Sequence, residues 1–276
     1  MAFFGCSVSR RPLKPAPCFP EAPDADNLFR LDGETALITG GGTGLGLAIA
    51  RSMAWAGAKV ILAGRRGAVL EAAAATIGRQ AAFAVCDVRR LKEVPKLIAR
   101  TEARLGPITI LVNNAGIHLK KPALKTSEQE FLRVLQTHVL GAHGVTRAVL
   151  PGMLRRRKGS IIFVASMASL FGIPEVLAYS AAKSAYLGMV RSLATEVSPA
   201  GVRVNAIAPG WIETEMTRRA MAGDPARRRR ILARTPLGRF GKPEDIGAAA
   251  VYLCSPAGKF VTGIVLPVDG GVSIGF

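Results

Sequence analysis

A glycine-rich turn near the start of the chain constrains its fold more than any other feature. The turn, TGGGTGLG at residues 39–46, follows the apolar run 35–38 and precedes a helical pattern that continues to Trp55. A strand, a glycine turn and a helix in this order let the backbone approach a pyrophosphate, because the helix N-terminus offers free N–H groups and a positive dipole end. The glycine spacing is G-x-x-x-G-x-G, and tight packing of a strand on a helix is the alternative explanation for it.

The rest of the chain alternates between short apolar runs and helical patterns. Runs of five or six apolar residues without polar alternation are typical of parallel strands that are covered on both faces. Strands are expected at 35–39, 58–63, 81–86, 108–112, 160–165, 202–207 and 264–267. Helices are expected near 45–56, 67–78, 91–105, 127–157, 178–198, 214–222 and 243–255. The alternation predicts right-handed βαβ units and therefore an α/β fold with a doubly wound parallel sheet.

The 276 residues contain no linker between these elements, so we expect one domain at 28–276. Residues 1–27 carry five prolines and no periodicity, which indicates a flexible tail. No apolar run reaches the ~20 residues that a membrane helix needs. Four scattered cysteines and three histidines lack metal-ligand spacing, so a reduced, cytoplasmic protein without a metal is the simplest expectation.

The net charge of +18 is large, and arginines concentrate at 155–157 and 227–230. Such a charge attracts an anionic partner: an acidic substrate, a phosphorylated cofactor, an acyl carrier or nucleic acid. The arginine runs lack interleaved aromatic residues and any known binding motif, so we do not expect nucleic-acid binding. A solvated, arginine-rich surface is the alternative to any anionic partner.

A second motif carries chemistry. Tyr179 and Lys183 are four residues apart and therefore share one face of a predicted helix. Ser166 lies at the end of the predicted strand 160–165. A free tyrosine has a pKa near ~10 and is a poor acid–base group at neutral pH, whereas a nearby ammonium favours the phenolate. We therefore expect Tyr179 as the acid/base, Lys183 as the group that lowers its pKa, and Ser166 as the group that orients a carbonyl.

With these motifs, and with Asp87-Val88, the NNAG sequence at 113–116 and the Pro209-Gly210 turn, the chain resembles the short-chain dehydrogenase/reductase family over roughly residues 28–276. The resemblance implies a single-domain Rossmann fold with a seven-stranded parallel sheet and hydride transfer between a nicotinamide and a carbonyl or secondary alcohol. It also implies a set of cofactor-binding residues: Thr39, Gly40, Gly42, Thr43, Gly44, Leu45, Gly46, Asp87, Val88, Asn113, Asn114, Ala115, Gly116, Tyr179, Lys183, Pro209, Gly210, Ile212 and Thr214.

The residues after the second predicted strand bear on which nicotinamide cofactor binds. NAD enzymes of this fold usually carry an acidic residue there, whereas this chain reads Gly64-Arg65-Arg66. Arg65 could bind a 2′-phosphate through a charge-assisted contact, so NADP(H) is favoured and NAD(H) remains possible.

One position departs from the family pattern. The family usually has an asparagine in its fourth helix, three residues before a glycine, and this asparagine is thought to hold a water that relays protons. In this chain His138 takes that position, three residues before Gly141. A neutral imidazole has one donor and one acceptor and could do similar work, with a pH dependence near neutrality. Weaker catalysis, or a cofactor-binding regulator with little turnover, is the alternative.

The sequence says least about the identity of the substrate. Lys120, Lys121 and Arg218 lie near the expected entrance and could meet a carboxylate. The chain looks most like gluconate 5-dehydrogenases and related sugar-acid oxidoreductases, followed by 3-oxoacyl carrier-protein reductases. The resemblance also implies a homodimer or homotetramer, with subunit contacts at the helices 127–157 and 178–198 and at Phe276.

Overall fold

The computed structural model describes residues 27–215, 217–218 and 225–275. The expected tail therefore lies outside the described residues except for Asn27, and so does Phe276.

The sheet has seven parallel strands, as expected. The strands lie in the order β3-β2-β1-β4-β5-β6-β7. Their bounds are β1 Thr35–Thr39, β2 Lys59–Gly64, β3 Ala81–Val85, β4 Ile110–Asn113, β5 Gly159–Val164, β6 Val202–Pro209 and β7 Val265–Val268. The strand order reverses between β1 and β4, and ligands of such sheets bind beyond the carboxyl ends of the strands at that point.

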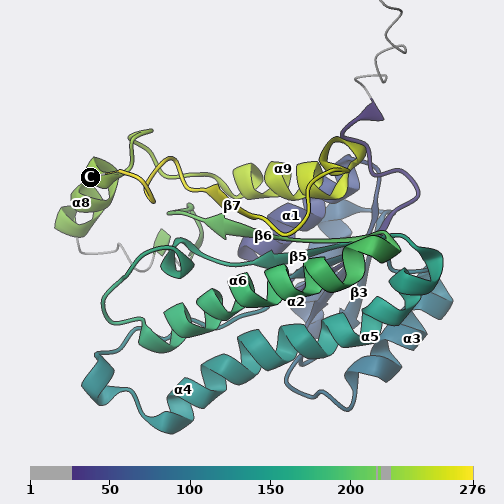
Figure 1. Ribbon diagram of the computed structural model, residues 1–276, viewed down its shortest axis with the longest axis horizontal. Helices are drawn as coiled ribbons and strands as arrows, with labels where there is room; N and C mark the ends of the chain where they lie inside the picture. The colour runs from purple at the N-terminus through teal and green to yellow at the C-terminus, as the bar shows by residue number, and fades with distance from the viewer. Residues whose placement is uncertain (1–26, 216, 219–224, 276) are drawn as a thin grey trace, which may run out of the picture.

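Helices cover both faces of the sheet (Figure 1). One face carries α1 (Gly44–Trp55), α2 (Gly67–Ile77) and α9 (Pro243–Cys254), and the other carries α3 (Val94–Leu105), α5 (Gly141–Arg156) and α6 (Leu177–Val197). Neighbouring β1 residues belong to different cores, since Ile38 packs under α1 and Leu37 packs toward α5 and α6. Every β1 residue is buried, which explains why the strand shows no polar alternation.

The helix expected over 127–157 is interrupted. α4 (Glu128–Leu135) and α5 are joined by a π-helical turn at Gln136–Leu140. A π turn holds an additional residue and rotates the side chains that follow it, which apolar periodicity does not report. It carries His138 into the interior, where 1% of its surface is exposed.

One described helix is absent from the sequence prediction. α8 (Pro225–Arg234) contains the second arginine run. Ile231 is its one core residue among those described, so the helix has no apolar periodicity to detect. The helix expected near 214–222 lies mostly outside the described residues. Within the described part of the chain, no helix combines the length and the apolar character that crossing a membrane requires.

Candidate active site

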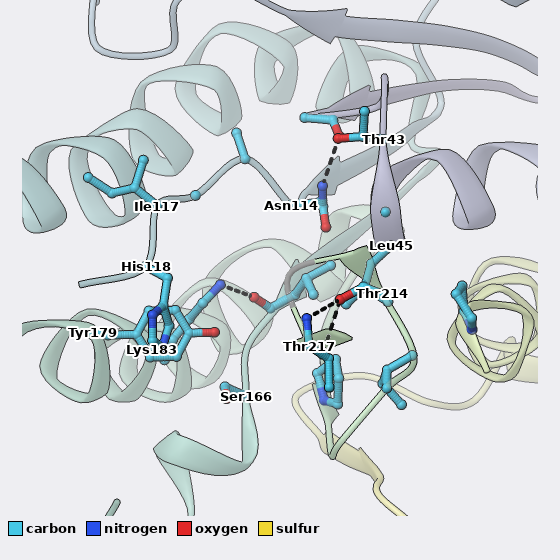
Figure 2. Close-up of a pocket in the computed structure, with 18 of the residues that line it drawn as sticks. Thr43, Leu45, Asn114, Ile117, His118, Ser166, Tyr179, Lys183, Thr214 and Thr217 are labelled. Carbon is cyan, nitrogen blue, oxygen red and sulfur yellow. Dashed lines mark hydrogen bonds between the residues drawn. The ribbon is translucent and has the colours of Figure 1, made fainter. Parts of the chain in front are cut away.

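A cleft of about 870 Å³ lies beyond the carboxyl ends of the central strands, where the fold places ligand sites. It brings together eighteen of the predicted site residues: Gly40, Thr43, Gly44, Leu45, Arg65, Asp87, Val88, Asn114, Ala115, Gly116, His138, Ser166, Tyr179, Lys183, Pro209, Gly210, Ile212 and Thr214. Thr39, Gly42, Gly46 and Asn113 do not line the cleft. Tyr179 and Lys183 lie at one end, and Thr43 and Leu45 lie toward the other (Figure 2).

The glycine turn fits a phosphate ligand. Thr43 is the extended N-cap residue of α1 and its side chain makes no capping bond, so the first N–H groups of the helix are left for a ligand. Gly40 has φ +66°, and a Cβ on it would lie 2.9 Å from the Asn114 amide nitrogen. A side chain at Gly40 would therefore push the turn away from the cleft wall.

Thr39 supports this wall from behind. Its Oγ1 accepts hydrogen bonds from the backbone N–H groups of Asn114 and Ala115, each at 3.0 Å, and donates to the Val112 carbonyl at 3.2 Å. The Asn114 side chain donates to the Thr39 carbonyl at 2.9 Å. These bonds tie the end of β1 to the end of β4, the two strands that flank the cleft.

The end of the cleft beside β2 is rich in cations. Arg65 and Arg66 line it together with Asp87. An ion pair with Arg89, 2.6 Å long, lowers the pKa of Asp87 to about 2, and Arg65 adds to this shift through its charge. Arg51 also lines the cleft but was not predicted from the sequence. It follows Leu47 by four residues, so helical spacing from the glycine turn could have identified it.

Ser166, Tyr179 and Lys183 converge at the other end (Figure 2). Ser166 follows β5, and its Oγ accepts a hydrogen bond from the Ala168 N–H at 3.1 Å. The Lys183 ammonium donates to the Val164 carbonyl at 2.5 Å and lies 5.7 Å from the centre of the Tyr179 ring. One helical turn of α6 and the end of β5 thus hold all three groups together.

The pKa shifts at this end correct one expectation. Burial raises the pKa of Tyr179, although a hydrogen bond with Ser166 opposes the shift. In the protein alone the net pKa of this phenol is therefore raised and not lowered as expected, because burial dominates. Burial also lowers the pKa of Lys183 to about 7. At neutral pH the tyrosine is therefore a protonated phenol, and the lysine lies near the midpoint of its own titration.

His138 contacts the same cluster. Its Nε2 lies 3.0 Å from the Ile117 amide nitrogen and 2.8 Å from the Ile117 carbonyl oxygen. Its ring meets the Tyr179 ring edge-on, with the centroids 5.6 Å apart. Burial, followed by the charge of Lys183, lowers the pKa of His138 to about 3. The imidazole is therefore neutral throughout the physiological range, and the expected titration near neutrality is wrong.

The three cations expected near the entrance differ in their surroundings. Lys120 and Arg218 line the cleft, whereas Lys121 does not. Each of them has a carboxylate partner: Glu175 for Lys120 at 3.2 Å, Glu130 for Lys121 at 2.9 Å and Glu215 for Arg218 at 3.4 Å. Sequence patterns gave no signal for Glu175.

The remaining wall carries hydroxyl and aromatic groups. Thr214 and Thr217 share a hydrogen bond of 3.1 Å, which shapes the segment after β6 (Figure 2). The His118 ring lies 5.0 Å from the Tyr179 ring, centroid to centroid. Among the described residues, no group of three His, Cys, Asp or Glu side chains could hold a metal ion.

Comparison with known proteins agrees with this geometry. Residues 40–273 match the family model described as enoyl-(acyl carrier protein) reductase. A Xanthobacter autotrophicus protein named inactive 2-(S)-hydroxypropyl-CoM dehydrogenase 2 is 43% identical over 82% of this chain and 99% of its own length. A galactitol 2-dehydrogenase (L-tagatose-forming) of Cereibacter sphaeroides is 41% identical over 91% of this chain and 99% of its own.

A solved structure extends the comparison. It is a gluconate 5-dehydrogenase from Burkholderia cenocepacia in complex with NADP and tartrate. This chain superimposes on it with a TM-score of 0.88 at 36% identity, and the match covers 92% of this chain and all of the other.

Proposed function

The chain belongs to the short-chain dehydrogenase/reductase family of NAD(P)-binding oxidoreductases, and from this we propose that it is an NADP(H)-dependent enzyme that interconverts a carbonyl and a secondary alcohol. The observation that carries the proposal is the convergence of Ser166, Tyr179 and Lys183 in the cleft that also contains the glycine turn. A protein that only bound the cofactor would not need Ser166, Tyr179 and Lys183 together.

The cofactor, when bound, supplies or accepts a hydride at the substrate carbon. The phosphates of the cofactor would be held by the free N–H groups at the start of α1, and Thr214 and Asn114 would line its path along the cleft. Ser166 would donate a hydrogen bond to the substrate oxygen and hold it beside Tyr179.

Tyr179 would move the proton. Its raised pKa keeps the phenol protonated at neutral pH, so it would give its proton to the developing alkoxide during reduction. Lys183, with a pKa of about 7, would return a proton toward the tyrosine and bind a ribose hydroxyl. His138 is neutral and buried beside both residues, so we assign it to positioning the segment after β4, in place of a titrating relay.

The preference for NADP(H) rests on Arg65 and Arg66. Both arginines line the end of the cleft near the end of β2, where an enzyme for NAD usually carries an acidic residue. A guanidinium favours a 2′-phosphate through charge-assisted hydrogen bonds. The solved relative in complex with NADP supports the same preference.

The proposed substrate is a sugar acid or a related polyol. Relatives named for galactitol and for gluconate, and the tartrate in the complex of one of them, support a small polyhydroxylated molecule. The cleft offers cations for a carboxylate at Lys120 and Arg218, with hydroxyl partners at Thr214 and Thr217.

A second candidate is reduction of a 3-oxoacyl group on an acidic carrier protein. The net charge of +18 and the exposed arginines of α8, Arg228 to Arg230, favour such a partner. The description of the matching family model also mentions acyl carrier protein.

One assay distinguishes these functions. NADPH oxidation is followed at 340 nm with 5-keto-D-gluconate, L-tagatose and an acetoacetyl thioester, with NADH and the Tyr179→Phe variant in parallel. Rapid oxidation with a keto sugar, abolished by the substitution, supports the proposal. Preference for the thioester supports the carrier-protein alternative. Tight NADPH binding without turnover of any substrate would point to a regulator, and one relative is itself named as inactive.

We further propose that the enzyme is a cytoplasmic homodimer or homotetramer. Leu132, Leu140 and Leu177 expose 53%, 46% and 52% of their surface on or beside α4, the π turn and α6, and a subunit contact would cover them. Sedimentation equilibrium tests the assembly, and a monomer at micromolar concentration would contradict it.

A further inference from the structure

Two loops meet at the mouth of the cleft. One follows β4 and contains Lys120 and Lys121, and the other, residues 173–176, precedes α6. The Lys121 N–H donates to the Glu175 carbonyl at 2.6 Å, and the Lys120 ammonium lies 3.2 Å from a Glu175 carboxylate oxygen. Lys120 and Ile173 both line the cleft. The backbone bond fixes the position of Lys120 relative to α6 and therefore to Tyr179.

The two lysines are held differently. Lys121 makes two bonds of 2.9 Å to Glu130, whose carboxylate also accepts the Ser127 N–H in the capping box of α4. Its ammonium therefore belongs to a local network outside the cleft. Lys120 makes a single contact with Glu175, and about half of each side chain is exposed. A pair this long and this exposed contributes little, so another carboxylate can replace Glu175 at small cost.

Glu175 has an unusual backbone. It has φ +66°, and Arg157 is the other non-glycine residue with a positive φ among the described residues. Arg157 is the C-cap residue of α5, where the left-handed conformation is common. Glu175 ends no helix, and a strained residue of this kind beside a cleft is typical of functional segments. In this conformation its carboxylate lies 3.2 Å from the Lys120 ammonium.

We infer that Lys120 is the residue that binds the anionic group of the substrate, and that Glu175 is its resting partner, displaced when the substrate carboxylate arrives. The inference rests on the proposed function, because it specifies how that site recognises a sugar acid. Arg218 also lines the cleft and pairs with Glu215 on its own segment, whereas Lys120 is placed relative to α6 by the backbone bond between Lys121 and Glu175. An uncharged polyol gains nothing from Lys120 while Glu175 neutralises it, so the pair favours anionic substrates over neutral ones.

Three variants test the inference: Lys120→Met, Glu175→Gln and the matched control Lys121→Met. The substrates are D-gluconate and its uncharged analogue D-glucitol, with NADP⁺. Lys120→Met should raise KM for gluconate about tenfold, which corresponds to loss of one charge-assisted contact, and leave KM for glucitol unchanged. Glu175→Gln keeps the size of the side chain but removes the competing charge, so KM for gluconate should fall. Lys121→Met should change neither.

A binding measurement separates this inference from the proposed reaction. Calorimetric titration of gluconate and glucitol into the NADP⁺-loaded protein needs no turnover. If oxidation fails but gluconate binding still depends on Lys120 and strengthens in Glu175→Gln, the reaction is wrong and the anion site stands. Equal losses for both ligands in Lys120→Met, weaker gluconate binding in Glu175→Gln, or no preference of the wild-type protein for gluconate would each overturn the inference.

Discussion

A single ring nitrogen of His138 meets both backbone polar groups of Ile117, the amide nitrogen at 3.0 Å and the carbonyl oxygen at 2.8 Å. It can accept from the first or donate to the second, depending on the tautomer. The other ring nitrogen, Nδ1, is buried without a hydrogen-bond partner among the described residues. The imidazole therefore holds the segment after β4 beside Tyr179, and protonating it would require an uncompensated buried charge.

This arrangement predicts a loss of stability in mild acid. The pKa of His138 is about 3 in the fold and near 6.5 in an unfolded chain. As pH falls from 6.5, the unfolded chain gains a proton that the folded protein does not, so the free energy of unfolding decreases toward pH 3. The variant His138→Asn lacks this contribution.

Urea denaturation of both proteins at pH 7, 6 and 5 measures the effect. The free energy of unfolding of the wild-type protein should decrease relative to that of the variant over this range. Glu130 and Asp87, whose pKa values are lowered to about 2, contribute mainly below this range and are common to both proteins. Parallel stability curves would contradict a buried neutral imidazole.

The same imidazole makes Gly116 a sensitive position. A Cβ on Gly116 would collide with the His138 ring carbon Cε1 and lie 2.9 Å from each ring nitrogen. Gly116→Ala should therefore cost about 1–3 kcal/mol of stability, the usual cost of overpacking.

A double-mutant cycle tests the cause. In the His138→Ala background the added methyl group has room, so Gly116→Ala should cost much less there. Gly172→Ala is the matched control, because a Cβ on Gly172 would meet no atom within 4 Å. An equal cost of Gly116→Ala in both backgrounds would show that the ring is not the obstacle.

Sequence predicted the fold well because the features that determine it are local and periodic. All five residues of Thr35–Thr39 are buried, so the strand contains no charged or strongly polar residue and could be predicted from its sequence. The residues at the cofactor end of the cleft could be predicted for a similar reason. Gly40 lies in the glycine turn and Asn114 follows a strand end, and the order of the strands determines the position of both. Arg51 was missed although its spacing from Leu47 carries the signal.

Other features depend on packing that no local pattern encodes. The π turn at Gln136–Leu140 rotates His138 inward, and nothing in the spacing of residues distinguishes it from an α-helical turn. The pKa of Tyr179 depends on how deeply it is buried, and burial raises this pKa despite the hydrogen bond with Ser166. The positive φ of Glu175 could not be predicted, because the position is not occupied by glycine.

The position of Arg65 leads to a prediction about the preference for NADPH over NADH. Arg65→Ser removes a cation from the end of the cleft where we place the 2′-phosphate, so KM for NADPH should rise about 10- to 100-fold, while KM for NADH should change little. Arg104→Ser, on the outer surface of α3, is the control for the loss of one positive charge. Equal changes in KM for NADPH and NADH would argue against phosphate recognition by this side chain.

The shifted pKa of Lys183 predicts a second pH dependence of stability, at higher pH than the one caused by His138. Burial lowers its pKa to about 7, against an ordinary value of 10.5. Between these values the unfolded chain carries a proton that the folded protein lacks, so stability rises with pH across this window, by at most about 1.4 kcal/mol per pH unit. In Lys183→Met this slope is absent, because methionine does not titrate. Denaturation at pH 7, 8 and 9 should therefore show the wild-type protein gaining stability relative to the variant at each step. A constant difference would mean that the ammonium stays charged in the fold up to pH 9 and that burial does not lower the pKa of Lys183.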